Sequence, residues 1–271
     1  PNRLTEISSA LEYRSIDPLV VWEERICMRR RLTTPSMAKD TCLKVNFETA
    51  KSREPQYQEC LDAVTARGFE RLGLRSSQSW HDDPRHLLFR LSRYKFVAKM
   101  LAGSEHVLEI GCGDAFGTRL VQQEVKALSA TDFDAVFVDD VKARMEEKWR
   151  FPVFTHDLLA GPIGGSFDGV FALDVLEHIA PEHEHVFLAN GIAPLSQHGV
   201  AIIGMPSLES QIYASPTSRA GHVNCKTMPD LKAAMQRHFH NVFMFSMSDE
   251  VVHTGYHKTA HYLFALACSK K

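Results

Sequence analysis

The sequence predicts an α/β fold in which a mostly parallel sheet follows a helical N-terminal extension. From residue 106 onward, short apolar segments alternate with amphipathic ones, a pattern typical of parallel strands connected by helices. Residues 1–80 are charged and show no alternation of the strand type. The last two apolar segments, 241–247 and 261–268, have no helical segment between them, so we expect these two strands to pair antiparallel.

We assign residues 1–83 to the extension and residues 84–271 to the α/β domain. Within the extension only residues 52–73 show a clear helical pattern, and Gly73 is the expected end of that helix. A second helix is predicted over residues 84–101. The extension can serve as a lid, a recognition surface or a dimer arm, so a homodimer is one assembly that the sequence allows.

The α/β domain is predicted to contain seven strands separated by helices. The predicted strands are residues 106–110, 126–131, 151–155, 168–173, 199–204, 241–247 and 261–268. The predicted helices are residues 116–124, 134–147, 181–193 and 229–238.

The composition is typical of a soluble globular protein and indicates neither a nucleic-acid nor a membrane partner. Hydrophobic residues make up 44% of the 271 residues and charged residues 24%, both ordinary values. The net charge of -2 shows no excess of basic residues, so we expect no nucleic-acid partner. No apolar run approaches the ~20 residues that cross a bilayer, so we expect no membrane partner. The six cysteines include no C-x-x-C pair, which favours reduced thiols and a cytoplasmic location.

A glycine-rich loop follows the first predicted strand and leads into a helix. Glycines at such a turn accept positive φ angles and let the backbone approach a ligand. A dinucleotide loop places its third glycine where Phe116 stands here, and a phosphate-binding P-loop ends on a lysine that is absent. The cofactor-binding residues expected in this loop are Glu109, Gly111, Cys112, Gly113 and Gly117.

Acidic residues stand at the carboxyl ends of four consecutive strands, where α/β sheets bind their ligands. Besides Glu109, these are Asp132, Asp157 and Asp174. Asp132 offers two acceptor oxygens for the hydroxyls of a ribose, and Asp157 is placed to accept from an adenine amino group. A cationic sulfonium cofactor suits such an acidic edge, whereas a pyrophosphate would be repelled.

Four segments resemble, in order, the motifs of the class I S-adenosylmethionine (SAM)-dependent methyltransferases. They are Val107–Asp114, Thr131–Asp134, His156–Leu158 and Leu173–Ile179. The match covers roughly residues 84–271 and is strongest for the branch that contains the ubiquinone-pathway O-methyltransferases. The resemblance implies a Rossmann-like, doubly wound, seven-stranded sheet whose last strand is antiparallel, with SAM as the cofactor.

The resemblance also implies roles for residues around the cofactor. Glu109, Gly111 and Gly113 would border its methionine end. Asp132 would hold the ribose, and Phe133 would pack on the adenine. The remaining predicted cofactor residues are His156, Asp157, Leu158 and Asp174.

Two histidines are the candidates for the base that an oxygen acceptor requires. His178 follows the fourth strand and His222 lies in the long loop after the fifth, so both follow the carboxyl ends of central strands. The substrate-binding residues expected around the opening are Tyr213, Arg219, Asn224 and Tyr256.

No metal site is predicted, but one alternative stays open. Asp174, Glu177 and His178 would share one face of a helix, and some ubiquinone-pathway relatives carry a similar acid-acid-His set. The same D-x-x-E spacing is also that of a capping box at the start of a helix.

The predicted function is methyl transfer from SAM to a small molecule or a glycan, to oxygen in preference to nitrogen or carbon. The Asn/Asp-Pro-Pro-aromatic signature of nucleic-acid amino-methyltransferases is absent after the fourth strand, where the sequence reads Asp174–Glu177. Two other classes stay open: a non-catalytic SAM-binding or regulatory subunit, and an NAD-dependent oxidoreductase.

Overall fold

The structure, a computed structural model, describes residues 46–271, and the chain divides into two compact units with the boundary between Phe69 and Glu70. The part of the predicted extension before residue 46 lies outside the described residues. The sheet and every predicted site residue belong to the second unit, Glu70–Lys271.

In the described part of the first unit, residues 46–69, an α-helix follows a short turn. The 3-10 turn η1 (Pro55–Tyr57) leads into α2 (Gln58–Arg67), which ends at Gly68 with a φ angle of 75°. The helix predicted over residues 52–73 is therefore shorter than expected, because Gly68 adopts the left-handed backbone that terminates a helix.

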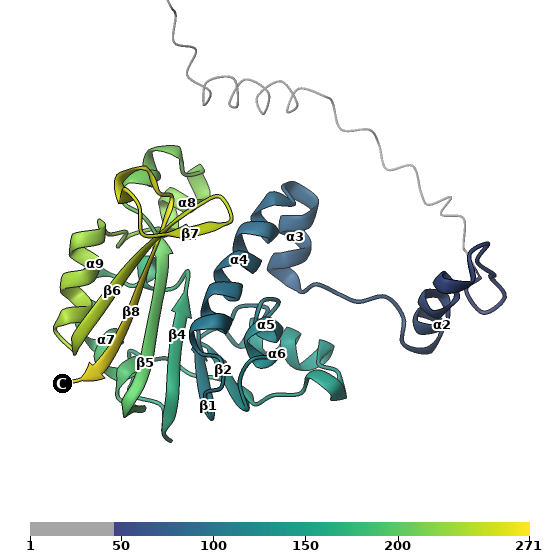
Figure 1. The fold of residues 1–271 in the computed structure, drawn as a ribbon, viewed down its shortest axis with the longest axis horizontal. Helices are drawn as coiled ribbons and strands as arrows, with labels where there is room; N and C mark the ends of the chain where they lie inside the picture. The colour runs from purple at the N-terminus through teal and green to yellow at the C-terminus, as the bar shows by residue number, and fades with distance from the viewer. Residues whose placement is uncertain (1–45) are drawn as a thin grey trace, which may run out of the picture. The chain divides into compact units, whose positions relative to one another are not determined.

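The second unit is built on one eight-stranded sheet of order β3-β2-β1-β4-β5-β8-β6-β7 (Figure 1). The five strands from β3 to β5 are parallel, and β8 is antiparallel to both of its neighbours. The bounds are β1 His106–Ile110, β2 Ala127–Asp132, β3 Val153–Thr155, β4 Phe167–Leu173, β5 Leu195–Pro206, β6 Phe239–Ser248, β7 Val251–His253 and β8 Tyr262–Lys270. The predicted mostly parallel sheet with an antiparallel last strand is confirmed. The count of seven was one too low, because the three residues of β7 are too few to show a periodicity.

Helices cover both faces of the sheet, as predicted (Figure 1). Side chains of α4, α5 and α6 join one apolar cluster with Val107, while those of α7 and α9 join a second with Leu108 and Ile110. Adjacent residues of β1 point to opposite faces because side chains alternate along a strand. The helices are α3 Leu74–Asp82, α4 Arg85–Met100, α5 Thr118–Gln122, α6 Ala135–Arg144, α7 Glu184–Ile192, α8 Pro216–Gly221 and α9 Met228–Gln236, and the 3-10 turns are η2 Glu147–Trp149, η3 Leu176–His178, η4 Pro181–His183, η5 Glu209–Tyr213 and η6 His257–Thr259. Across residues 46–271, no helix is both long enough and apolar enough to cross a membrane.

Helix α3 was not predicted, and it changes the role of Gly73. This glycine has a φ angle of 106° and precedes the first residue of α3 instead of ending the helix before it. A Cβ atom at Gly73 would lie 2.6 Å from the Cβ atom of Asp114 in the glycine loop, so only glycine fits this approach. Because α3 and Glu70 belong to the same unit as the sheet, that unit starts before residue 84, where we placed the boundary.

Candidate active site

The glycine loop lies at the carboxyl end of β1, against the turn that follows β4. Gly111 and Gly113 have φ angles of 73° and 53°, in the left-handed region that favours glycine. A Cβ atom at Gly111 would lie 2.3 Å from Cγ2 of Val175, so the loop needs glycine to approach this turn. The methionine end of the predicted cofactor site and the turn after β4 are therefore adjacent.

Asp132, the last residue of β2, holds the glycine loop in place. Its Oδ2 accepts a hydrogen bond from the backbone N–H of Gly113 at 2.8 Å, and its Oδ1 accepts one from Asp134 at 3.0 Å. A carboxylate has about four acceptor positions, so two remain for a ligand. Asp132 can therefore bind the two hydroxyls of a ribose while it fixes the loop.

The residues predicted around the adenine fall into two groups. Phe133 has 76% of its surface exposed, and Asp157 is exposed with one oxygen accepting from the Leu159 N–H at 2.8 Å. Both are available to a ligand. Leu158 instead packs in the apolar core, and a ring nitrogen of His156 lies 2.9 Å from the carbonyl oxygen of Gly161. These two residues shape the loop after β3, and their side chains make contacts within the protein.

Glu109 supports the glycine loop from behind. Its carboxyl group is 1% exposed and accepts hydrogen bonds from the hydroxyls of Tyr94 and Thr118, both at 2.6 Å. Burial is the largest cause that raises the pKa of Glu109, to about 7, against the lowering by these two bonds. The carboxyl therefore joins α4 and α5 to β1.

The other two predicted loop residues are also packed within the protein. Cys112 is buried, and burial raises the pKa of its thiol. Gly117 lies against the Tyr94 ring.

Asp174 is held by an arginine that was not among the predicted site residues. Nη1 of Arg93, on α4, donates to both carboxylate oxygens of Asp174, at 2.8 and 2.7 Å. The Arg93 guanidinium also lies 3.9 Å from the ring centroid of Tyr262. Burial opposes ionisation of Asp174, but the charges of Arg93 and then of Arg75 lower its pKa. Asp174 has a φ angle of 57° and precedes only the single 3-10 turn η3, so it does not form the capping box.

Glu177, His178 and His222 form a cluster beside Asp174. One ligand atom of each residue lies within 4.8 Å of those of the other two. The loop after β5 brings His222 there, because the backbone N–H groups of Val223 and Asn224 both donate to the carbonyl oxygen of Glu177, at 2.8 and 3.0 Å. Both predicted catalytic histidines are therefore brought together, with ring centroids 5.2 Å apart.

The hydrogen bonds of the two histidines leave one nitrogen of each available. Nδ1 of His178 lies 2.8 Å from the carbonyl oxygen of Gly221, and Nδ1 of His222 lies 2.8 Å from Oε1 of Gln211. Since both partners accept, each Nδ1 carries the proton and each Nε2 has a free lone pair in the neutral ring. Burial and then the charge of His178 lower the pKa of His222, which favours its neutral form.

Glu177 is the unsatisfied member of the cluster. Its side chain is 1% exposed, and neither carboxylate oxygen has a hydrogen-bond partner within the described part of the chain. Burial, followed by the charge of Asp174, raises the pKa of Glu177 to about 8. A buried carboxylate without a partner is costly unless a cation compensates it.

These donors fit a divalent metal ion. Two imidazole nitrogens and one carboxylate suit Mn²⁺, Fe²⁺, Co²⁺ or Zn²⁺, and histidine ligands usually donate their other N–H to a carbonyl, as here. This ligand set differs from the set Asp174, Glu177 and His178 that the sequence left open. Asp174 forms an ion pair with Arg93, and His222 is the third member of the cluster in its place.

The predicted substrate residues do not form one group. Tyr213 and Tyr256 are 62% and 65% exposed. Arg219 is exposed and donates from Nε to the carbonyl oxygen of Ala214 at 2.9 Å. Asn224 is buried, and its side chain donates to Glu184 at 2.9 Å. Our prediction that Asn224 binds substrate was wrong, because its side chain is used inside the protein.

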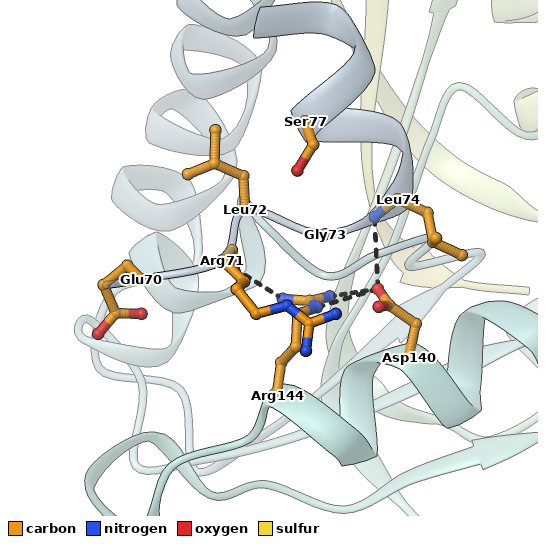
Figure 2. Close-up of a pocket in the computed structure, with 8 residues that line it drawn as sticks. All are labelled: Glu70, Arg71, Leu72, Gly73, Leu74, Ser77, Asp140 and Arg144. Atoms are coloured by element: carbon orange, nitrogen blue, oxygen red, sulfur yellow. Dashed lines mark hydrogen bonds and ion pairs between the residues drawn. The ribbon is translucent and has the colours of Figure 1, made fainter. Parts of the chain in front are cut away.

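A cavity beside the glycine loop lies away from these residues (Figure 2). It has a volume of about 380 Å³ and separates the segment before α3 from α6. Arg144 crosses it and donates to Asp140 at 2.8 Å and to the carbonyl oxygen of Asp114 at 2.7 Å. Arg144 and Asp140 pair with each other across it, and it contains none of the predicted site residues, so we assign it no part in the chemistry. The lining residues are Glu70, Arg71, Leu72, Gly73, Leu74, Ser77, Asp140 and Arg144.

Comparisons with known proteins agree with this geometry. Residues 107–199 match the family model described as a methyltransferase domain. No curated protein matches the sequence. The N-methyltransferase NodS of Bradyrhizobium japonicum, solved with S-adenosylhomocysteine (SAH), is similar at a TM-score of 0.52 and 18% identity, over 69% of this chain and 89% of that one.

Two archaeal structures share the fold. A putative methyltransferase of Haloferax volcanii, solved in complex with the activator Trm112, is similar at a TM-score of 0.59 and 13% identity, over 78% of this chain and 97% of that one. A SAM-dependent methyltransferase of Archaeoglobus fulgidus gives a TM-score of 0.52 and 19% identity, over 69% and 94%.

Residues 107–199 thus match a methyltransferase domain model, and the fold is the Rossmann-like α/β fold of these solved methyltransferases. The match and the fold support SAM as the cofactor, as predicted, and do not favour an NAD-dependent oxidoreductase or a non-catalytic subunit. Because 1253 solved chains share this fold, the fold alone does not identify the acceptor.

Proposed function

We propose that this chain is a SAM-dependent methyltransferase that transfers the methyl group to a hydroxyl oxygen of a small molecule or glycan. The observation that carries the proposal is the position of the Glu177–His178–His222 cluster, on the turn against which the cofactor loop packs. The cofactor loop contacts this turn at Val175, two residues before Glu177. An acceptor at the cluster would therefore lie next to the methionine end of the cofactor, where the transferred methyl group is carried.

The cluster also supplies what an oxygen acceptor needs. A hydroxyl is a weak nucleophile until its proton is removed, whereas a neutral amine has a lone pair ready. Nε2 of His178 and Nε2 of His222 each have a lone pair that can take this proton. A divalent metal held by both rings and Glu177 would occupy these two lone pairs; it would instead lower the pKa of the acceptor hydroxyl, so that the proton passes to solvent. Asp132 and the glycine loop position the donor, and positioning alone can supply about 7–11 kcal/mol of the barrier.

A turnover experiment tests this proposal. Methyl transfer from labelled SAM would be measured against a panel of hydroxylated metabolites and sugars and a matched panel of amines, with and without added Mn²⁺ or Zn²⁺. We expect transfer to a hydroxyl compound, lost on chelation and in Glu177→Ala, and reduced roughly 10²-fold in His222→Gln. Transfer to amines alone, or full activity of Glu177→Ala in excess chelator, would contradict the proposal. Glu182→Ala is a matched control that changes an exposed acid outside both the cluster and the cofactor site.

Finer assignments rest on the sequence motifs. The segment Leu173–Ile179 supports kinship with the ubiquinone-pathway O-methyltransferases, and the lack of C-x-x-C pairs supports a cytoplasmic location. The roles of residues 1–83 as a lid, a recognition surface or a dimer arm stay predictions, as does the homodimer.

A further inference from the structure

The place of His222 in the cluster is set by a loop, whereas the places of Glu177 and His178 are set by the sheet. Glu177 and His178 lie on η3, shortly after β4 ends. His222 follows α8, in the long segment between β5 and α9. Its ring bonds to Gln211, which belongs to the same segment. This segment must therefore be fixed to the rest of the domain if His222 is to bind the same ion as Glu177 and His178.

Three polar side chains fix the segment to α7. Nζ of Lys226 lies 2.6 Å from Oε2 of Glu184, and Nδ2 of Asn224 donates to the same oxygen at 2.9 Å. Nζ of Lys226 also donates to Oδ1 of Asn224 at 3.1 Å. Each member of this triad, Glu184–Asn224–Lys226, contacts the other two. No member can turn away without losing two of these interactions.

The triad is shielded from water and is attached to a packed helix. The side chains of Lys226 and Glu184 are 15% and 11% exposed, and Asn224 is buried, so solvent screens their interactions less than those of a surface pair. Glu184 is the first residue of α7, whose Phe187 and Leu188 pack in the apolar core beside the sheet. Helix α7 therefore gives the segment a fixed point of attachment.

Asn224 links this attachment to the cluster itself. Its side chain donates to Glu184, while its backbone N–H donates to the carbonyl oxygen of Glu177 at 3.0 Å. The backbone N–H of Val223, next to His222, donates to the same carbonyl oxygen at 2.8 Å. A movement of Asn224 would therefore change the separation of His222 from Glu177.

The triad suits a role in geometry better than a role in stability. Taking two charges out of water costs free energy that offsets much of their attraction, so a poorly exposed ion pair is weak evidence for added stability. A polar network in which every member is bonded restricts its groups to one arrangement. Metal sites depend on such restriction, because the hydrogen bonds around the ligands orient them.

We propose that Glu184, Asn224 and Lys226 are the positioning residues of the metal site. They hold His222 where its Nε2 atom can bind the same divalent ion as Glu177 and His178. This inference rests on the proposed function, because it requires that metal site. The three side chains bond to one another, so they act on the metal through the position of His222.

Titration with Co²⁺ tests the inference, on the full chain after chelation and gel filtration. Changing the hydrogen-bond partners around metal ligands costs about 10–100-fold in affinity, so Asn224→Ala should bind Co²⁺ roughly 10- to 100-fold more weakly than the wild type. The visible absorption of bound Co²⁺ depends on its ligands and their geometry, so the spectrum of Asn224→Ala should shift toward that of His222→Ala. A role in stability alone would not change this spectrum.

Two further variants change the triad more gently. Glu184→Gln keeps an oxygen that accepts from Asn224, so it should recover part of the Co²⁺ affinity lost in Glu184→Ala. Lys226→Met keeps the bond between Asn224 and Glu184 and should bind Co²⁺ roughly tenfold more weakly than the wild type. SAH affinity should equal that of the wild type in every triad variant, because no predicted cofactor residue is changed.

Lys270→Met is the matched control, because Lys270 stabilises the other end of α7. Its Nζ donates to the carbonyl oxygens of Ile192, Ala193 and Leu195, at 3.0, 2.9 and 3.1 Å. We expect Lys270→Met to lower stability and to leave Co²⁺ affinity unchanged. Wild-type Co²⁺ affinity in Asn224→Ala, or an equal loss in Asn224→Ala and Lys270→Met, overturns the inference while the proposed function stands.

Circular dichroism shows which variants are folded. If Asn224→Ala is unfolded, Lys226→Met decides, and wild-type affinity with the wild-type spectrum in that variant overturns the inference. If the wild type does not bind Co²⁺, or if His222→Ala binds it as tightly, the metal site of the proposed function fails and this inference with it.

Discussion

Replacing Glu109 by glutamine should change how stability depends on pH. Burial raises the pKa of the Glu109 carboxyl from 4.5 to about 7 in the folded protein. Between these two values the unfolded chain has lost the proton while the folded protein keeps it, so the free energy of unfolding falls as pH rises. The rise of about 2.5 units corresponds to about 3 kcal/mol at about 1.4 kcal/mol per unit. This contribution is fully present below pH 4.5 and is lost above about pH 7.

Glu109→Gln removes this titration, because an amide stays neutral throughout. Urea unfolding followed by circular dichroism at pH 5 and at pH 8 would measure the free energy of unfolding of both proteins. Other titrating groups are common to both and cancel in the comparison. Since part of the contribution is already lost at pH 5, we expect the variant to gain about 2.5 kcal/mol relative to the wild type between the two pH values. A difference that stays constant within about 1 kcal/mol would show that Glu109 ionises normally, and the account of its burial would be wrong.

Three further predictions follow from particular contacts. A Cβ atom at Gly117 would lie 2.2 Å from the Tyr94 ring, so Gly117→Ala should lower stability by about 1–3 kcal/mol; an unchanged melting temperature would refute this. After loading with Mn²⁺ or Zn²⁺ and gel filtration, elemental analysis should find about one metal per wild-type chain and far less in Glu177→Ala, whereas equal content in both would exclude Glu177 as a ligand. Asn224→Ala should lower stability by about 1–3 kcal/mol because it leaves Glu184 without a partner amide, yet SAH affinity measured by calorimetry should not change.

Features set by local sequence were predicted well. The strand β1 and the glycine loop are contiguous, and the alternation of apolar strands and helices gave the parallel sheet. Asp132 was placed at the end of β2 for the same reason, since a strand end follows directly from the apolar segment before it. Helix α3 was missed because its sequence, Leu74–Asp82, has few apolar residues to reveal a face.

Features set by long-range contacts could not be predicted from spacing. Arg93 and Asp174 are 81 positions apart, and nothing in either segment indicates the other. His222 reaches His178 only because the loop after β5 bonds to the backbone of Glu177. Both histidines were predicted from the sequence, but the candidate metal-ligand set contained Asp174, whereas the structure has His222 in that set. Asn224 was assigned to the substrate, although its side-chain amide binds Glu184.

Calorimetry of cofactor binding tests the central claim most directly, since every other assignment depends on the cofactor. The wild-type chain should bind SAH and should not bind NAD. Asp132→Ala should bind SAH at least tenfold more weakly, because the carboxylate that fixes Gly113 and would hold the ribose is gone. Tight binding of NAD by the wild type, with no binding of SAH, would contradict the account.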